Sequence, residues 1–113
     1  KFARCAAEGK PLPIWGDGLQ RVDMVHVRDV ARACRHFAEN RIQGTYNIGS
    51  GEAENVLSVA SWFGVDAEYP LPDYKIPHDR TVVTKKARAA GWFAIESPID
   101  AAEELVEYAR NRA

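Results

Sequence analysis

Residues 11–31 read PLPIWGDGLQRVDMVHVRDVA and hold two predicted extended segments, a tight turn and the start of a helix. The first extended segment covers residues 11–15 and ends at Gly16-Asp17-Gly18, where two glycines give the backbone the freedom that a reversal needs. The second covers residues 24–27. A helix is expected from Asp29, an acidic residue that suits an N-cap or the first helical turn.

The helix predicted from Asp29 to about Asn40 is amphipathic. Its apolar face carries Val30, Ala33, Cys34 and Phe37, and its polar face carries Arg28, Arg32, Arg35 and Glu39. The three arginines on one face of the predicted helix would suit contact with nucleic acid. Asp29 and Glu39 share the face, however, and the formal net charge is -1, so a solvated face is favoured.

The rest of the chain alternates helical and extended patterns, which predicts an α/β fold. The predicted elements are a helix end at residues 2–8, a strand at 44–49, a helix at 56–63 capped by Asn55, an extended segment at 67–71, and helices at 82–90 and 99–112.

The composition indicates one globular domain. The chain has 113 residues, of which 46% are hydrophobic, and a domain of this size buries about 65% of its extended-chain surface. There is no signal peptide and no apolar run of about 18 residues, and Cys5 and Cys34 lack metal-ligand spacing. A cytoplasmic protein without a membrane or nucleic-acid partner is therefore expected. The start at Lys1, inside a helical pattern, suggests a cut edge.

Candidate reactive groups are few. The turn Gly49-Ser50-Gly51 sits between a strand and a helix, where N–H groups can hold phosphate, but it lacks the dinucleotide and P-loop spacings, so a plain turn is favoured. His26, His36 and His78 are too scattered for a metal site, and no metal is predicted. His26 is expected to be a packing residue at a strand end.

Five segments carry a family resemblance. In order, they are GKPLPIWGDGLQ, VDMVHVRDVARA, GTYNIGSGE, TKKARAAGW and the closing amphipathic helix. They resemble the C-terminal part of the NAD-dependent nucleotide-sugar epimerases and dehydratases, the extended short-chain dehydrogenases, and are most similar to UDP-glucose 4-epimerase-like and ADP-heptose epimerase-like enzymes. The resemblance implies a Rossmann-like α/β fold in which residues 1–113 form the last helix-strand unit of the sheet plus a small α+β substrate lobe.

The same resemblance implies that the cofactor and the catalytic residues lie elsewhere. Family members bind NAD through an N-terminal glycine motif and use a Tyr-x-x-x-Lys pair. The present sequence has only Tyr74 next to Lys75, and adjacent residues do not share a helical face. No catalytic or cofactor-binding residue is therefore expected here, and NAD would be bound by a missing N-terminal part. The alternative is a truncated, non-catalytic module that binds a nucleotide sugar or a protein partner.

Two segments are expected to hold a nucleoside-diphosphate sugar. The resemblance places Trp15 beside the base, although a tryptophan is more often a core residue. It assigns the diphosphate to an arginine directly before Asp23, where this chain has Val22 and carries arginine one position earlier, at Arg21. Because successive strand residues face opposite sides, Arg21 is either a diphosphate ligand or a surface arginine.

The second segment is the loop PDYKIPHDR at residues 72–80. Here the resemblance offers Lys75 in place of a phosphate-binding arginine, Asp79 as the ribose-binding acid and Arg80 as a reserve cation. A loop of solvated charges is the alternative. The helix predicted at 56–63 is also about one turn shorter than is usual in the family, which would move this loop relative to the pocket.

Overall fold

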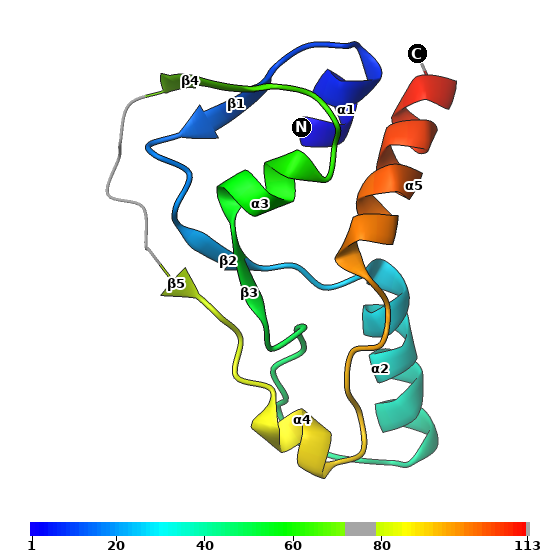
Figure 1. Cartoon of the computed structure of the whole chain (residues 1–113). Helices are drawn as coiled ribbons and strands as arrows, with labels where there is room; N and C mark the ends of the chain where they lie inside the picture. Colours follow the sequence, from blue (N-terminus) through cyan, green and yellow to red (C-terminus); the bar gives the residue numbers. More distant parts are fainter. Residues whose placement is uncertain (72–78, 113) are drawn as a thin grey trace.

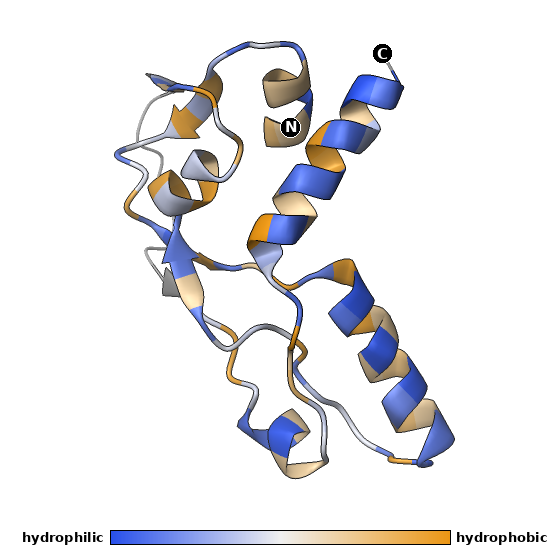
Figure 2. Cartoon of the chain, turned by 45° about the vertical axis from the view of Figure 1, so that its right-hand side comes forward, coloured by the Kyte–Doolittle hydropathy of each residue, from blue (hydrophilic) through white to orange (hydrophobic). Residues whose placement is uncertain are grey.

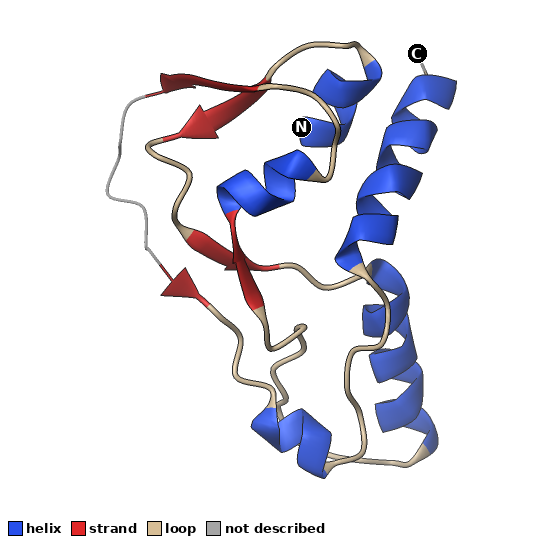
Figure 3. Cartoon of the chain, viewed as in Figure 1, coloured by secondary structure: helices blue, strands red, loops and turns tan. Residues whose placement is uncertain are grey.

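The computed structural model describes residues 1–71 and 79–112, which form five helices and five short strands (Figures 1 and 3). In chain order these are α1 (Phe2–Ala7), β1 (Leu12–Trp15), β2 (Arg21–Asp23), α2 (Val27–Glu39), β3 (Ala53–Asn55), α3 (Val56–Ser61), β4 (Ala67–Leu71), β5 (Asp79–Arg80), α4 (Lys85–Ala89) and α5 (Pro98–Asn111). The α/β class predicted from the sequence is confirmed.

The strands form two small sheets. In one, β1 pairs in parallel with β4. In the other, β2 lies in the middle, antiparallel to β3 and parallel to β5. Helix α3 follows β3 directly, and α5 packs beside α1 at the same end of the molecule (Figure 1).

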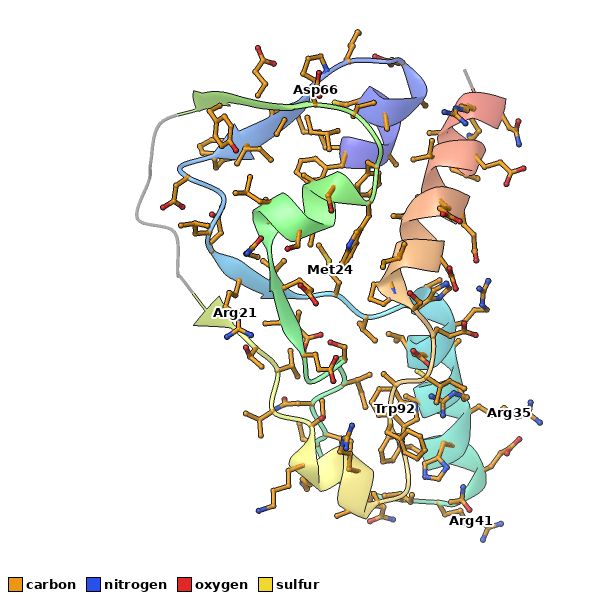
Figure 4. All side chains as sticks on the ribbon, in the orientation of Figure 1. Arg21, Met24, Arg35, Arg41, Asp66 and Trp92 are labelled. Atoms are coloured by element: carbon orange, nitrogen blue, oxygen red, sulfur yellow. The ribbon has the colours of Figure 1, made fainter. Side chains whose placement is uncertain are left out.

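Each end of the molecule has its own apolar core. Leu12, Ile14 and Ala60 are buried at the β1 end, against partly buried side chains that include Phe2, Leu57 and Phe63. At the other end Ala33 of α2, Ala87 of α4 and Trp92 are buried together (Figure 4). Figure 2 shows hydrophobic residues alternating with hydrophilic ones along α2 and α5, as expected for helices with one buried face.

Most of the predicted elements are present. The turn at residues 16–18 has positive φ at Gly16 and Gly18, 63° and 75°. The helices α3 and α5 and the strand β4 lie within two residues of their predicted limits. Among the described residues, no helix combines the length and the apolar character needed to cross a bilayer.

The second strand was predicted wrongly, whereas Asp29 lies in the first turn of α2, which is one of the two positions predicted for it. The strand is Arg21–Asp23, not residues 24–27, and α2 begins at Val27. His26, rather than Asp29, is the N-cap, because its Nδ1 accepts a hydrogen bond from the backbone N–H of Arg28 at 3.0 Å. The packing role predicted for His26 is confirmed by its burial, but the residue lies at a helix N-cap rather than at a strand end.

Two further boundaries differ from prediction. Residues 45–48 form no strand, because a strand needs a backbone ladder and no other segment in the described part of the chain supplies one. Helix α4 begins at Lys85 rather than at residue 82, since the chain leaving β5 is held by a bond from the backbone N–H of Val82 to Asp23.

Candidate functional site

The parallel pairing of β2 with β5 brings two predicted site segments side by side. Arg21 lies opposite Asp79, and Val22 lies opposite Arg80. Arg21 is seen next to β5 in Figure 4. The predicted diphosphate residue and the predicted ribose residue are thus neighbours along the backbone, although they are far apart in the sequence. Lys75 lies outside the described residues.

Arg21 is an exposed residue at the start of β2. Its Nη2 donates a hydrogen bond to the backbone carbonyl of Ala53 on β3, at 3.0 Å. This bond holds the guanidinium against the sheet. Arg21 is thus exposed and yet anchored, which is compatible both with a diphosphate ligand and with a surface arginine. A guanidinium is always charged and offers a planar fork of donors that matches phosphate oxygens.

Trp15 ends β1 and belongs to the other sheet, in register with Leu71 of β4. The residue is 40% exposed, so it is not part of the apolar core. The side-chain amide of Gln20, a buried residue, donates to the carbonyl of Trp15 at 3.1 Å and fixes the turn between β1 and β2. In the sequence, β4 of this sheet and β5 of the other are the elements directly before and after residues 72–78.

Asp23 is a residue that sequence reasoning did not single out. Its Oδ1 accepts hydrogen bonds from the backbone N–H and the hydroxyl of Ser50, at 2.7 and 2.8 Å. Its Oδ2 accepts from the backbone N–H of Gly51 at 2.9 Å and from that of Val82 at 3.3 Å. No local pattern in the sequence could have indicated these bonds, because the partners lie at least 27 positions away.

These bonds decide how the Gly49-Ser50-Gly51 turn is used. Its N–H groups at Ser50 and Gly51 point to an anion, as the glycine pattern suggests, but the anion is the Asp23 carboxylate of the same chain. The prediction of a plain structural turn is confirmed.

The polar face of α2 is occupied by ion pairs. Arg28 holds Glu104 of α5 through two bonds, of 3.1 and 2.7 Å, and the hydrogen bond from Arg28 lowers the pKa of Glu104. Arg35 pairs with Glu39 at 2.8 Å. The solvated stripe predicted for this face is therefore correct for Arg35, whereas Arg28 joins α2 to α5.

A surface cavity of about 310 Å³ opens beside the Ser50 turn. Its lining includes Met24, Ser50, Glu54, Trp62, Arg88 and Glu96, and neither Trp15 nor Arg21 is part of it. The described residues contain no group of three His, Cys, Asp or Glu side chains arranged to hold a metal ion.

Comparison with known proteins supports the family predicted from the motifs. Residues 1–49 match the NAD dependent epimerase/dehydratase family. Over 96% of its length the chain is 30% identical to the low-salt glycan biosynthesis protein Agl12 of Haloferax volcanii, and it covers 37% of that protein. A 45-residue stretch is 49% identical to dTDP-glucose 4,6-dehydratase of Neisseria meningitidis serogroup B, covering 39% of this chain and 13% of that enzyme.

The fold leads to the same group of enzymes. The chain superimposes on UDP-glucose 4-epimerase of Thermotoga maritima, solved with UDP-glucose, with a TM-score of 0.82 and 27% identity, over 98% of this chain and 38% of the epimerase. The chain thus spans less than two fifths of these relatives. The matching family model, the Neisseria dehydratase and the Thermotoga epimerase all belong to the NAD-dependent nucleotide-sugar epimerases and dehydratases, the family predicted from the motifs of this chain.

Proposed function

We propose that this chain is the substrate-binding part of an NAD-dependent nucleotide-sugar epimerase or dehydratase, and that it holds a nucleoside-diphosphate sugar. The observation that supports this most directly is the β2–β5 ladder, which sets Arg21 opposite Asp79 in a fold shared with an epimerase solved with UDP-glucose.

Each proposed contact matches one part of the ligand. Arg21, Lys75 and Arg80 supply positive charge for the diphosphate, which is bound best by charge-assisted hydrogen bonds. Asp79 accepts hydrogen bonds from ribose hydroxyls, since a carboxylate offers two acceptor oxygens. Trp15 presents an exposed aromatic ring to the base.

In the described part of the chain, neither of the two Gly-x-Gly turns is arranged to bind NAD. In the turn at residues 49–51, the N–H groups of Ser50 and Gly51 donate to Asp23 and so are not available to a phosphate. The turn at residues 16–18 lies between two strands rather than at a helix start, where phosphate is usually bound. We therefore propose that another stretch of polypeptide binds NAD and carries the Tyr and Lys of the catalytic pair. NAD supplies hydride transfer, which ordinary side chains cannot perform. The part proposed here binds and orients the sugar nucleotide.

Calorimetry on the full natural polypeptide that contains these residues tests the proposal. Arg21→Ala and Lys75→Ala should each weaken binding of UDP or dTDP by about 1.5–3 kcal/mol, the contribution of a hydrogen bond to a charged group. Arg35→Ala is the matched control, because Arg35 pairs with Glu39 on the exposed face of α2.

Unchanged affinity in both the Arg21 and the Lys75 variants would remove these residues from the site. Binding without any turnover in the full polypeptide would favour the non-catalytic module instead.

A further inference from the structure

Asp23 stands where three segments of the proposed site meet. It is the last residue of β2, two positions after Arg21 in the same strand, so both side chains leave the same face of the sheet. Its carboxylate reaches the turn at residues 49–51 and the chain that leaves β5. One carboxylate therefore connects the strand of Arg21 with the segment that carries Asp79 and Arg80.

The four bonds to Asp23 account for the acceptor capacity of a carboxylate, which offers about four lone-pair positions. Three of the bonds come from backbone N–H groups, and the fourth comes from the Ser50 hydroxyl, whose single proton is shared between Asp23 and the carbonyl of Glu52. An ionised carboxylate suits such a set, whereas an amide of the same shape would turn an NH₂ group toward two of the donors.

Asp23 extends a ladder that is otherwise very short. The β2–β5 pairing comprises Arg21 with Asp79 and Val22 with Arg80. Beyond it, the backbone N–H of Val82 is bound by the Asp23 side chain at 3.3 Å. Because two residue pairs give little stability by themselves, this bond adds a further attachment between β2 and the chain leaving β5.

The packing around the turn supports the same conclusion. A Cβ atom on Gly49 would lie 2.7 Å from Cβ of Val82, and one on Gly51 would lie 3.0 Å from Oγ1 of Thr84. The turn and the chain after β5 therefore touch directly, and Asp23 bonds to both.

We infer that Asp23 is a positioning residue for nucleotide-sugar binding: it fixes β5, and with it Asp79 and Arg80, beside Arg21 without contacting the ligand. This inference rests on the proposed function. The inference gives Asp23 a positioning role, whereas Arg21, Lys75 and Arg80 are proposed to bind the diphosphate directly.

Asp23→Asn in the full natural polypeptide tests the inference, with UDP and dTDP as calorimetric probes. Two of the four bonds are lost, so the Kd of the tighter probe should rise about tenfold. With UDP-glucose or dTDP-glucose as substrate, KM should rise in parallel while kcat stays within about twofold, since the reacting groups lie elsewhere. Asp17→Asn is the control, because Asp17 accepts a bond from Leu19 within its own turn and should change neither quantity.

A double-mutant cycle separates positioning from general destabilisation. If Asp23 acts by positioning Asp79 and Arg80, its substitution should weaken binding much less in a background that already carries Asp79→Ala and Arg80→Ala. Additive losses would overturn the inference. Should Asp23→Asn fail to fold, Ser50→Ala removes the hydroxyl bond to Asp23, together with the local bonds to Glu52, keeps the three backbone bonds to Asp23, and should raise the Kd about two- to threefold.

The two proposals fail in different ways. Unchanged affinity in Arg21→Ala argues against the proposed site itself. Weaker binding in Arg21→Ala, together with unchanged binding in both Asp23→Asn and Ser50→Ala, leaves the site in place and overturns the role of Asp23.

Discussion

Asp29 fastens the segment before α5 to the first turn of α2. Its side chain is fully buried and accepts hydrogen bonds from Arg32 at 2.9 Å and from the backbone N–H groups of Ile95 and Glu96, at 3.2 and 2.9 Å. Burial alone raises the pKa of Asp29, but the bonds from Arg32, Glu96 and Ile95 together outweigh it and lower the pKa below the ordinary value. The charged form is therefore the one that stabilises the fold.

Asp29→Asn should destabilise the protein by about 2 kcal/mol, because an amide NH₂ would face the buried N–H donors. Chemical denaturation measures this loss. Asp100→Asn is the matched control, since Asp100 lies exposed in the first turn of α5. Equal stability of the Asp29 variant and the control would contradict the fastening role.

The same residue predicts how stability depends on pH. A lowered folded-state pKa means that the contribution of Asp29 is complete above the unfolded-state value, about 3.9, and is lost as pH falls through the folded-state value. The difference in unfolding free energy between the wild type and Asp29→Asn should therefore be constant from about pH 5 to 7 and shrink in acid. If this difference in unfolding free energy grew as the pH fell, the lowered pKa of Asp29 would be contradicted.

At the scale of elements, α3 depends on Asn55, the residue directly before it. Asn55 ends β3 and caps α3, with its side-chain oxygen accepting from the backbone N–H of Ser58 at 2.8 Å. It also lies opposite Arg21 in the β2–β3 ladder. The helix has six residues, too few to be stable by itself, so its cap and its packing on β1 matter.

Asn55→Ala should lower the unfolding free energy by about 1 kcal/mol, the usual cost of a lost N-cap. Asn55→Asp keeps the acceptor oxygen and places a negative charge at a helix N-terminus, so it should retain the wild-type stability. Thermal or urea denaturation distinguishes the two variants. A loss of similar size in both would show that the amide group, rather than its acceptor oxygen, stabilises this end of the helix.

On the scale of the whole molecule, the α2 side carries apolar surface next to residues 45–48. A cavity of about 260 Å³ is lined there by Val30, Ala33, Cys34, Phe37, Ile42, Gly44, Tyr46 and Ile48. Tyr46 packs against Phe37 with ring centroids 4.6 Å apart. If the cofactor-binding part exists as proposed, its parallel strand is the expected partner for residues 45–48.

We predict that residues 1–113 expressed alone show no epimerase or dehydratase turnover and exchange the amide protons of residues 45–48 rapidly. Hydride transfer needs bound NAD and a base, and an unpaired edge leaves amides open to water. Co-expression with a family N-terminal half should restore activity on UDP-glucose or ADP-heptose and slow the exchange. Turnover by residues 1–113 alone would refute the proposed division of labour, and slow exchange would show that the segment is buried by another route.

Elements specified by neighbouring residues were predictable from the sequence. The two glycines at residues 16–18, the Asn55 cap and the periodicity of α5 each act over a few positions, and each lies where the pattern predicts it. The family resemblance likewise rested on segments readable in order along the chain.

Tertiary structure alone decided what the buried carboxylates do. Asp29 was expected as an N-cap or as an acid of the first helical turn and lies in the first turn, but its backbone partners Ile95 and Glu96 are 66 and 67 positions away and no local pattern indicates them. Asp23 likewise finds Ser50 and Val82, 27 and 59 positions away. A burial-dependent hydrogen bond has no local sequence pattern, because its acceptor and donor meet only when the chain has folded.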